Sequence, residues 1–142
     1  MITALKKAIE TINVPTFAVC GTLLGLVRDG TLISWDDDID LAIWEMDRHR
    51  LDLSKFNVTR TLGNDYVGHE YTVAIDRINI DIFVMHPSPD YCWFNVGHRY
   101  QYEYPRITDI EERQFQELRM CVPTNAEECL EANYGPNWRQ PP

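Results

Sequence analysis

The segment 77–85, RINIDIFVM, constrains the fold of this chain most strongly. It alternates as a strand does, with one face made by Ile78, Ile80, Ile82 and Val84 and the other by Asn79, Asp81 and Phe83. A carboxylate inside a sheet is strongly unfavourable unless a partner compensates its charge. The sequence therefore predicts a central strand whose Asp81 pairs with a cation such as Arg77, caps a turn, or belongs to a functional site.

A second alternating segment, 38–44, follows directly on a run of acidic residues. Its apolar face holds Ile39, Leu41 and Ile43, and its other face holds Asp38, Asp40 and Ala42. Asp38 and Asp40 therefore share one side of a strand, where their like charges repel. A divalent cation removes that repulsion, and Mg²⁺ or Mn²⁺ prefers carboxylate oxygens. With Asp81 on a neighbouring strand, the pair predicts a metal platform.

Other interpretations of the acidic run are weaker than a metal site for Asp38 and Asp40. For Asp36 and Asp37 one of them is equally good. A solvated turn explains Asp36 and Asp37 as well as a functional role does. An EF-hand loop is improbable, because Leu41 stands where such a loop needs Gly and Asp47 where it needs Glu. A glycosidase pair usually places its carboxylates on separate elements around a cleft.

Gly21 and Thr22 mark a strand-to-helix turn upstream of these carboxylates. Residues 16–20 predict a short buried strand, Thr22 predicts a helix cap, and Gly30 predicts the end of that helix. Backbone N–H groups at a helix N-terminus bind phosphate readily. Together with the three aspartates, this turn indicates metal-assisted phosphoryl or nucleotidyl transfer.

The remaining segments complete a predicted α+β chain. Helices are expected at 2–13, ended by Pro15, at 45–53, and after a capping box of Thr124 and Glu127 that leads to Gly135. Strands are expected at 55–62, 69–75 and 115–122, with a turn at 63–65. Residues 86–106 are rich in Pro, Tyr, His and Trp and predict a long loop.

Size and charge limit the possible functions. The chain has 142 residues, which predicts one domain over 1–142, and its net charge is −9. Such a charge argues against a broad nucleic-acid-binding face, which needs Lys and Arg. The N-terminus does not read as a signal peptide and no segment is apolar enough to span a membrane, so a cytoplasmic location is expected.

The four cysteines are spaced irregularly, which predicts free thiols in a reducing compartment. A zinc site is a less favoured alternative, with possible ligands His86, Cys92, His98 and Cys121.

Three blocks of the sequence together resemble the LicD family, which includes phosphocholine transferases and is similar to fukutin and fukutin-related protein. The blocks are GTLLGLVRDGTLISWDDDIDLAI, INIDIFV and VPTNAEECLEANYGPNWRQP. The resemblance implies a nucleotidyltransferase-like mixed β-sheet with helices packed mainly on one side. It also implies transfer of a substituted phosphate from a CDP-activated donor to a sugar hydroxyl or other small acceptor, with Mg²⁺ or Mn²⁺.

The resemblance assigns roles to particular residues of this chain. Asp38, Asp40 and Asp81 would bind the metal and act in catalysis, with Asp81 or Asp36 taking the acceptor proton. The expected substrate-binding residues are Gly21, Thr22, Arg28, Asp36 and Asp37, although Arg28 fits a solvated helix end equally well. Trp35 either stacks on a ligand or lies in the core.

The acceptor region is less defined, because the chain is shorter than typical members of the family. Segment 86–106 is the expected place for acceptor contacts, with candidates His86, His98, Arg99, Tyr100 and Tyr102, and an aromatic box for choline would draw on Trp93, Tyr100 and Tyr102. Two alternatives stay open, namely a nucleotidyltransferase that moves NMP from an NTP, and an inactive nucleotide-binding domain. The transferred group and any need for an oligomer are not evident from the sequence.

Overall fold

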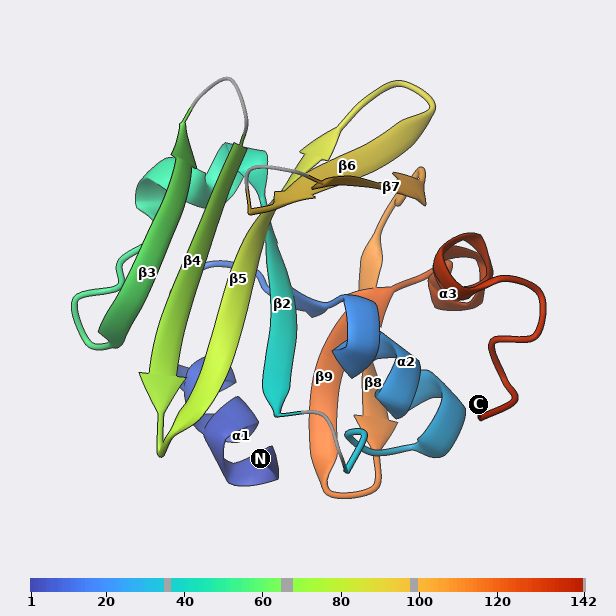
Figure 1. Ribbon diagram of the computed structural model, residues 1–142, viewed down its shortest axis with the longest axis horizontal. Coiled ribbons are helices and arrows are strands. Elements are labelled where there is room, and N and C mark those ends of the chain that lie inside the picture. The colour runs from blue at the N-terminus through green and yellow to red at the C-terminus, as the bar shows by residue number, and fades with distance from the viewer. Residues whose placement is uncertain (35–36, 65–67, 98–99, 142) are drawn as a thin grey trace.

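The computed structural model describes residues 1–34, 37–64, 68–97 and 100–141 (Figure 1). Its helices are α1 (Ile2–Thr11), α2 (Cys20–Asp29), the 3₁₀ helix η1 (Glu45–Arg50) and α3 (Ala126–Tyr134). Its strands are β1 (Phe17–Ala18), β2 (Asp38–Trp44), β3 (Asn57–Asn64), β4 (Gly68–Ile75), β5 (Ile78–Pro87), β6 (Tyr91–Val96), β7 (Tyr100–Pro105), β8 (Ile110–Phe115) and β9 (Leu118–Pro123). The predicted α+β class with a mixed sheet is confirmed.

The main sheet has the strand order β1-β2-β5-β4-β3, and β6 and β7 extend it from the far end of β5. Strands β2 and β5 run parallel, while the other described pairs in the sheet are antiparallel. Strands β8 and β9 form a separate hairpin. In Figure 1 this hairpin lies with α2 and α3 beyond the β2 side of the sheet.

The two central strands bury one face completely. Ile39, Leu41 and Ile43 of β2 have no exposed surface, and neither have their neighbours Ile80, Ile82 and Val84 on β5. Helix α1 contributes Ala4, Leu5 and Ala8 to the same core cluster. The predicted alternation in both strands is confirmed, and its apolar half forms the centre of the core.

Helix α2 begins three residues earlier than the sequence indicated. Its N-cap is Val19, so the prediction that Thr22 caps the helix is wrong. Thr22 lies inside the first turn, and its hydroxyl oxygen accepts a hydrogen bond from the backbone N–H of Asp40. Gly30 ends the helix with φ = 77°, which confirms the predicted glycine C-cap.

Segment 86–106 is not a long loop, which corrects the sequence prediction. It contains the end of β5 and a hairpin of β6 and β7. Phe94 and Tyr104 are almost fully buried, and Phe94 packs on Phe83 of β5 with ring centroids 4.9 Å apart. Aromatic packing on the sheet therefore stabilises this hairpin, in which β7 alternates with Tyr100, Tyr102 and Tyr104 on one face.

The C-terminal third differs from the predictions in two details. Strand β9 was expected but its partner β8 was not. The predicted capping box is absent, because the Thr124 hydroxyl donates to the carbonyl oxygen of Asp109 and α3 starts after Asn125 with no side-chain cap. Gly135 follows the helix as predicted, with φ = 85°.

Strand β3 continues through the predicted turn residues Gly63 and Asn64, and Asp65 lies outside the described residues.

Candidate functional site

The predicted carboxylates meet on one face of the parallel pair β2–β5. In the register of these strands, Asp40 lies beside Asp81, and Asp38 lies beside Asn79. Paired positions in a parallel ladder point to the same side, so the three carboxylates share the face opposite the apolar core. Each is half-buried. The sequence prediction that Asp81 joins the pair from a neighbouring strand therefore agrees with the register.

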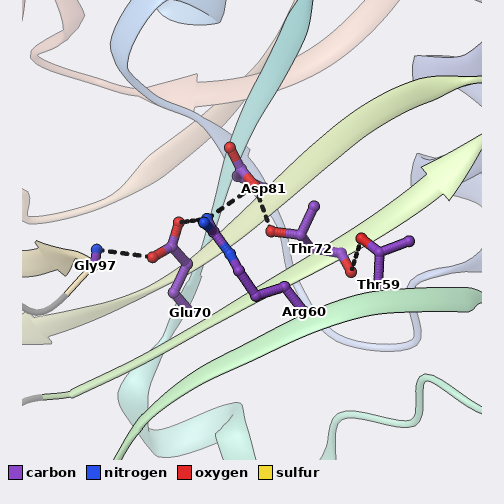
Figure 2. A network of polar contacts seen from close by, with 6 residues as sticks. All are labelled: Thr59, Arg60, Glu70, Thr72, Asp81 and Gly97. Atoms are coloured by element: carbon purple, nitrogen blue, oxygen red, sulfur yellow. Dashed lines mark hydrogen bonds and ion pairs between the residues drawn. The ribbon is translucent and has the colours of Figure 1, made fainter.

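The polar face continues over β4 and β3, as Figure 2 shows. The Thr72 hydroxyl of β4 donates a 2.6 Å hydrogen bond to Oδ1 of Asp81. Nη2 of Arg60, on β3, lies 4.0 Å from the same oxygen and 3.0 Å from Oε1 of Glu70. Asp81 thus has a hydroxyl donor and a nearby guanidinium, and the predicted pairing with Arg77 is replaced by a contact with Arg60.

A polar pocket of about 430 Å³ opens over this face. Its lining residues come from four adjacent strands and are Asp38, Thr59, Arg60, Thr72, Asn79 and Asp81. The pocket combines carboxylates, hydroxyls, an amide and one guanidinium. Such a lining suits a charged, strongly hydrated ligand better than an apolar one.

The turn at the start of α2 is tied to β2 by backbone and side-chain hydrogen bonds. Thr22 is 2% exposed, and its hydroxyl oxygen is 2.8 Å from the backbone nitrogen of Asp40. The N–H of Val19 also donates to the carbonyl oxygen of Asp40. Gly21 and Thr22 therefore lie directly beside the carboxylate strand, and the buried Thr22 hydroxyl positions Asp40.

Cys20 begins α2 with φ = 51°, a left-handed backbone conformation that is unusual for a residue with a side chain. The hydroxyl of Tyr104, from β7, accepts a 3.0 Å hydrogen bond from the Cys20 N–H and contacts its sulfur. Burial raises the pKa of the Cys20 thiol, and the nearby Asp40 raises it further. A raised pKa disfavours the reactive thiolate, and the contact with Tyr104 gives Cys20 a structural role that joins α2 to β7.

Arg28 lies in a different place from the carboxylates. Its guanidinium makes two 2.9 Å hydrogen bonds to the neighbouring Asp29, and this pairing lowers the pKa of the Asp29 carboxyl. It lines a second pocket of about 340 Å³ with Leu24, Ile33, Tyr134, Asn137, Trp138 and Gln140. The predicted role of Arg28 in phosphate binding stays a prediction, and this second pocket does not include the aspartates.

The other predicted acidic contacts are only partly visible. Asp37 is described and exposed just before β2. Trp35 and Asp36 lie outside the described residues, so their predicted ligand contacts stay predictions.

The zinc and choline hypotheses can be compared with strand register. His86 is paired with Trp93, and its ring stacks on that indole at 4.1 Å, whereas the buried Cys92 is paired with Pro87. Adjacent strand positions face opposite sides, so His86 and Cys92 diverge. The same rule separates Trp93 from Tyr102, which is opposite Phe94, so the predicted choline box is wrong. All four cysteines are free thiols, as predicted, and His98 lies outside the described residues.

The donor set fits a hard divalent cation in its chemistry. Carboxylate oxygens of Asp38, Asp40 and Asp81 share one face, and Mg²⁺ and Mn²⁺ take such ligands. Within the described ranges, however, no group of three or more His, Cys, Asp or Glu side chains is arranged to hold a metal ion. Asp81 is instead engaged by Thr72 and lies near Arg60. Cation binding is therefore a property to be tested in solution.

Arg60, Glu70 and Thr72 were not identified from the sequence as site residues. Glu70 is 3% exposed, and its carboxylate accepts hydrogen bonds from Arg60 and from the Gly97 N–H (Figure 2). The feature of the sequence that could have indicated these residues was the pairing of the two strands predicted at 55–62 and 69–75. Placing their alternating polar residues beside Asp81 would have required the strand order β5-β4-β3.

Comparison with known proteins identifies a family and relatives of this chain. Residues 13–125 match the family model described as "LicD/FKTN/FKRP, nucleotidyltransferase domain". The chain is 26% identical over 146 aligned residues to "Ribitol-5-phosphate transferase FKTN" from Macaca fascicularis, and 25% identical to the protein of that name from Homo sapiens. Each alignment covers 95% of this chain and 32% of the relative, so the chain spans about a third of these relatives.

No helix in the described part of the chain is long and apolar enough to cross a membrane. The family match begins before β1 and extends through β9, so it includes all of the strands that form the polar face. The chain belongs to the LicD/FKTN/FKRP family of nucleotidyltransferase domains.

Proposed function

We propose that this chain transfers a substituted phosphate from a CDP-activated donor to a hydroxyl of a sugar or other small acceptor. The observation that carries the proposal is the register of β2 and β5, which aligns Asp40 with Asp81 and puts them on the same face as Asp38. Asp38 and Asp81 also line the polar pocket over this face. Membership of a family whose relatives are named as ribitol-5-phosphate transferases supports a phosphate-transferring role. Those relatives make an alditol phosphate the first group to test.

Asp38, Asp40 and Asp81 would hold Mg²⁺ or Mn²⁺, which when bound would neutralise the donor diphosphate and the leaving CMP. The chain's own contacts prepare these side chains. Thr22 fixes the backbone of Asp40 through a 2.8 Å hydrogen bond, and Thr72 orients the Asp81 carboxylate through a 2.6 Å hydrogen bond. Fixed orientations of this kind reduce the reorganisation that charge transfer requires.

The proposed reaction is a single displacement at phosphorus. The acceptor hydroxyl oxygen forms a new bond to the phosphorus of the transferred group, and the bond from that phosphorus to the CMP oxygen breaks. The hydroxyl proton passes to a carboxylate, for which Asp81 is the candidate that lines the pocket. CMP leaves with the electron pair of the broken bond.

The β6–β7 hairpin is the proposed acceptor side. Tyr100 and Tyr102 are exposed, and the register places them on the hairpin face that also carries Phe94 and Tyr104. At one end of the hairpin, Gly97 donates a backbone hydrogen bond to Glu70 beside the pocket. Exposed tyrosine rings near a polar pocket suit contact with the apolar faces of a sugar.

Nucleotide binding is the experiment that tests this proposal. Binding of CDP and of ATP would be measured by calorimetry with and without Mn²⁺, on the native chain and on Asp38→Asn. Metal-dependent binding of CDP that is lost in the variant is expected. Product analysis would follow with CDP-ribitol, CDP-glycerol and CDP-choline, with release of CMP expected.

Three results would contradict the proposal in whole or in part. Preference for ATP with release of pyrophosphate would identify a nucleotidyltransferase that moves NMP. Failure of the folded native chain to bind any nucleotide would identify an inactive domain. Retention of full activity in both Asp38→Asn and Asp40→Asn would overturn the metal assignment.

A further inference from the structure

Arg60 occupies an irregular point of β3 that directs its side chain into the pocket. The β3–β4 register shifts between Val58 and Arg60, which leaves Thr59 as an extra residue on that strand. Bulges of this type bend a strand and re-aim the neighbouring side chain. Arg60 then lies opposite Thr72, the residue that binds Asp81, so its guanidinium reaches the carboxylate side of the sheet.

Glu70 holds this guanidinium in place. Its side chain is 3% exposed, and its two oxygens accept hydrogen bonds from Nη2 of Arg60 at 3.0 Å and from the Gly97 N–H at 2.9 Å. A buried carboxylate requires such partners, because an unpaired buried charge is strongly destabilising. Glu70 therefore fixes the orientation of the Arg60 guanidinium from the side away from the pocket, in the absence of any ligand.

The other side of Arg60 faces the pocket. Its side chain is 51% exposed, and both described contacts to carboxylates use Nη2 alone. A guanidinium has further N–H donors in one plane, an arrangement that matches the oxygens of a phosphate. Among the described residues that line the pocket, Arg60 is the single cationic side chain, and it faces Asp38 and Asp81.

We propose that Arg60 is a ligand for the diphosphate of the donor, and that Glu70 is the positioning residue that pre-orients it. The inference rests on the proposed function, because that function supplies a nucleotide diphosphate as substrate. A pocket with two carboxylates repels an anion, and a fixed guanidinium offsets part of that repulsion. Arg28 is paired with Asp29 at a different pocket, so Arg60 is the arginine that lies beside the carboxylates.

Calorimetry with inorganic pyrophosphate, CDP and cytidine, each with Mn²⁺, tests the inference. We expect Arg60→Gln to weaken binding of pyrophosphate and CDP by about tenfold or more, as expected for loss of a charge-assisted contact, and to leave cytidine binding unchanged. Arg60→Lys should be intermediate, because ammonium keeps the charge but loses the planar donor pair. Glu70→Gln should weaken pyrophosphate binding less than Arg60→Gln.

The matched control is Arg119→Gln, which breaks another arginine–glutamate pair. Nε of Arg119 lies 2.9 Å from Glu112 on the β8–β9 hairpin, outside the pocket. This variant should bind pyrophosphate as the native chain does. Because Arg60→Gln leaves Glu70 buried without its cation, the double variant Arg60→Gln/Glu70→Gln provides a second, charge-compensated test. Circular dichroism would verify that each variant is folded.

The outcomes separate the inference from the proposed function. If the folded double variant binds pyrophosphate as tightly as the native chain, Arg60 serves only to neutralise Glu70 and the inference is overturned. If the native chain binds pyrophosphate but not CDP, the proposed CDP-donor function is wrong. The role of Arg60 is then still tested by comparing pyrophosphate binding in the native chain and the Arg60 variants. A native chain that binds neither overturns both.

Discussion

The two faces of the β2–β5 pair are made by alternate residues of the same strands, yet they have opposite properties where the carboxylates lie. One face carries Ile39 and Ile82 with no exposed surface, and the other carries half-buried Asp40 and Asp81. Burial of the first face drives folding, while the second places like charges side by side at a cost in stability. Residues that stabilise the core and residues proposed for chemistry are therefore direct neighbours along the strand. Substitutions on one face should mainly change stability, and substitutions on the other face should mainly change activity.

The largest expected effect is on the carboxylate face. Asp40→Asn keeps the shape of the side chain and removes its charge. We expect turnover to fall below detection, a loss greater than the ~10²–10³-fold typical of removing one electrostatic contact to a transition state. Thermal unfolding should change little. Release of CMP from the CDP-linked donor is the measurement, and Asp76→Asn, at the exposed β4–β5 turn, is the control.

The next effect is on the apolar face. Ile82→Ala removes buried methyl groups from the centre of the core and should lower the free energy of unfolding by about 2–5 kcal/mol. The affinity of the folded fraction for CDP should be unchanged, because Ile82 points away from the pocket. Urea unfolding monitored by tryptophan fluorescence gives the first quantity and calorimetry the second. An affinity loss without a stability loss would contradict the separation of the two faces.

A smaller effect is expected at the hydrogen bond that joins α2 to β2. Thr22→Val removes the hydroxyl that accepts the Asp40 N–H and leaves that buried donor unpaired, which should cost about 1–3 kcal/mol. Both stability and activity should decrease, because this contact serves the fold and also positions a carboxylate. Thr22→Ser retains the hydroxyl and should restore most of both. Equal losses in the two variants would show that the methyl group, not the hydroxyl, matters.

The smallest effect concerns pH and His86, at the far end of β5. Burial lowers the pKa of His86, with Glu45 opposing the shift and His69 and Arg48 adding to it. The unfolded chain therefore takes up this proton more readily than the folded chain, so the free energy of unfolding falls as the pH drops from about 7 to 5. His86→Phe keeps the stacking on Trp93 and should reduce this fall. Thermal unfolding at both pH values measures it, and the exposed His49→Gln should leave the fall unchanged.

The sequence predicted the central strands correctly because their alternation is strong. Segments 38–44 and 77–85 each place an aliphatic residue at every second position, and this pattern is compatible with one strand orientation only. The same pattern isolated Asp81 as an exception inside an apolar strand. The three aspartates could therefore be placed on one face of neighbouring strands before their other neighbours were known, and their joint function stays a prediction.

The sequence did not predict the contacts that depend on strand order. Arg60 reaches both Glu70 and Asp81 only because β4 and β3 pair successively beside β5. The β6–β7 hairpin was missed because β6 carries aromatic residues on both faces, which hides the period of that strand, although Tyr100, Tyr102 and Tyr104 alternate along β7. Thr22 and Thr124 were assigned as caps from local spacing, whereas their hydroxyls bind Asp40 and Asp109, which are remote in sequence. Local propensity does not encode such partners.

The parallel pairing of β2 with β5 also has a consequence for the order of folding. The chain between these strands contains η1 and the antiparallel strands β3 and β4. Such non-local pairing loses chain entropy on closing the loop before the strands make any contact, and the pairing is correspondingly slow. Asp40 and Asp81 are then brought together only in the complete sheet. A ligand of the site will therefore bind the folded chain and not unfolded or partly folded chains, and it will stabilise the folded chain by mass action. Donor binding should for this reason also protect the chain from proteolysis.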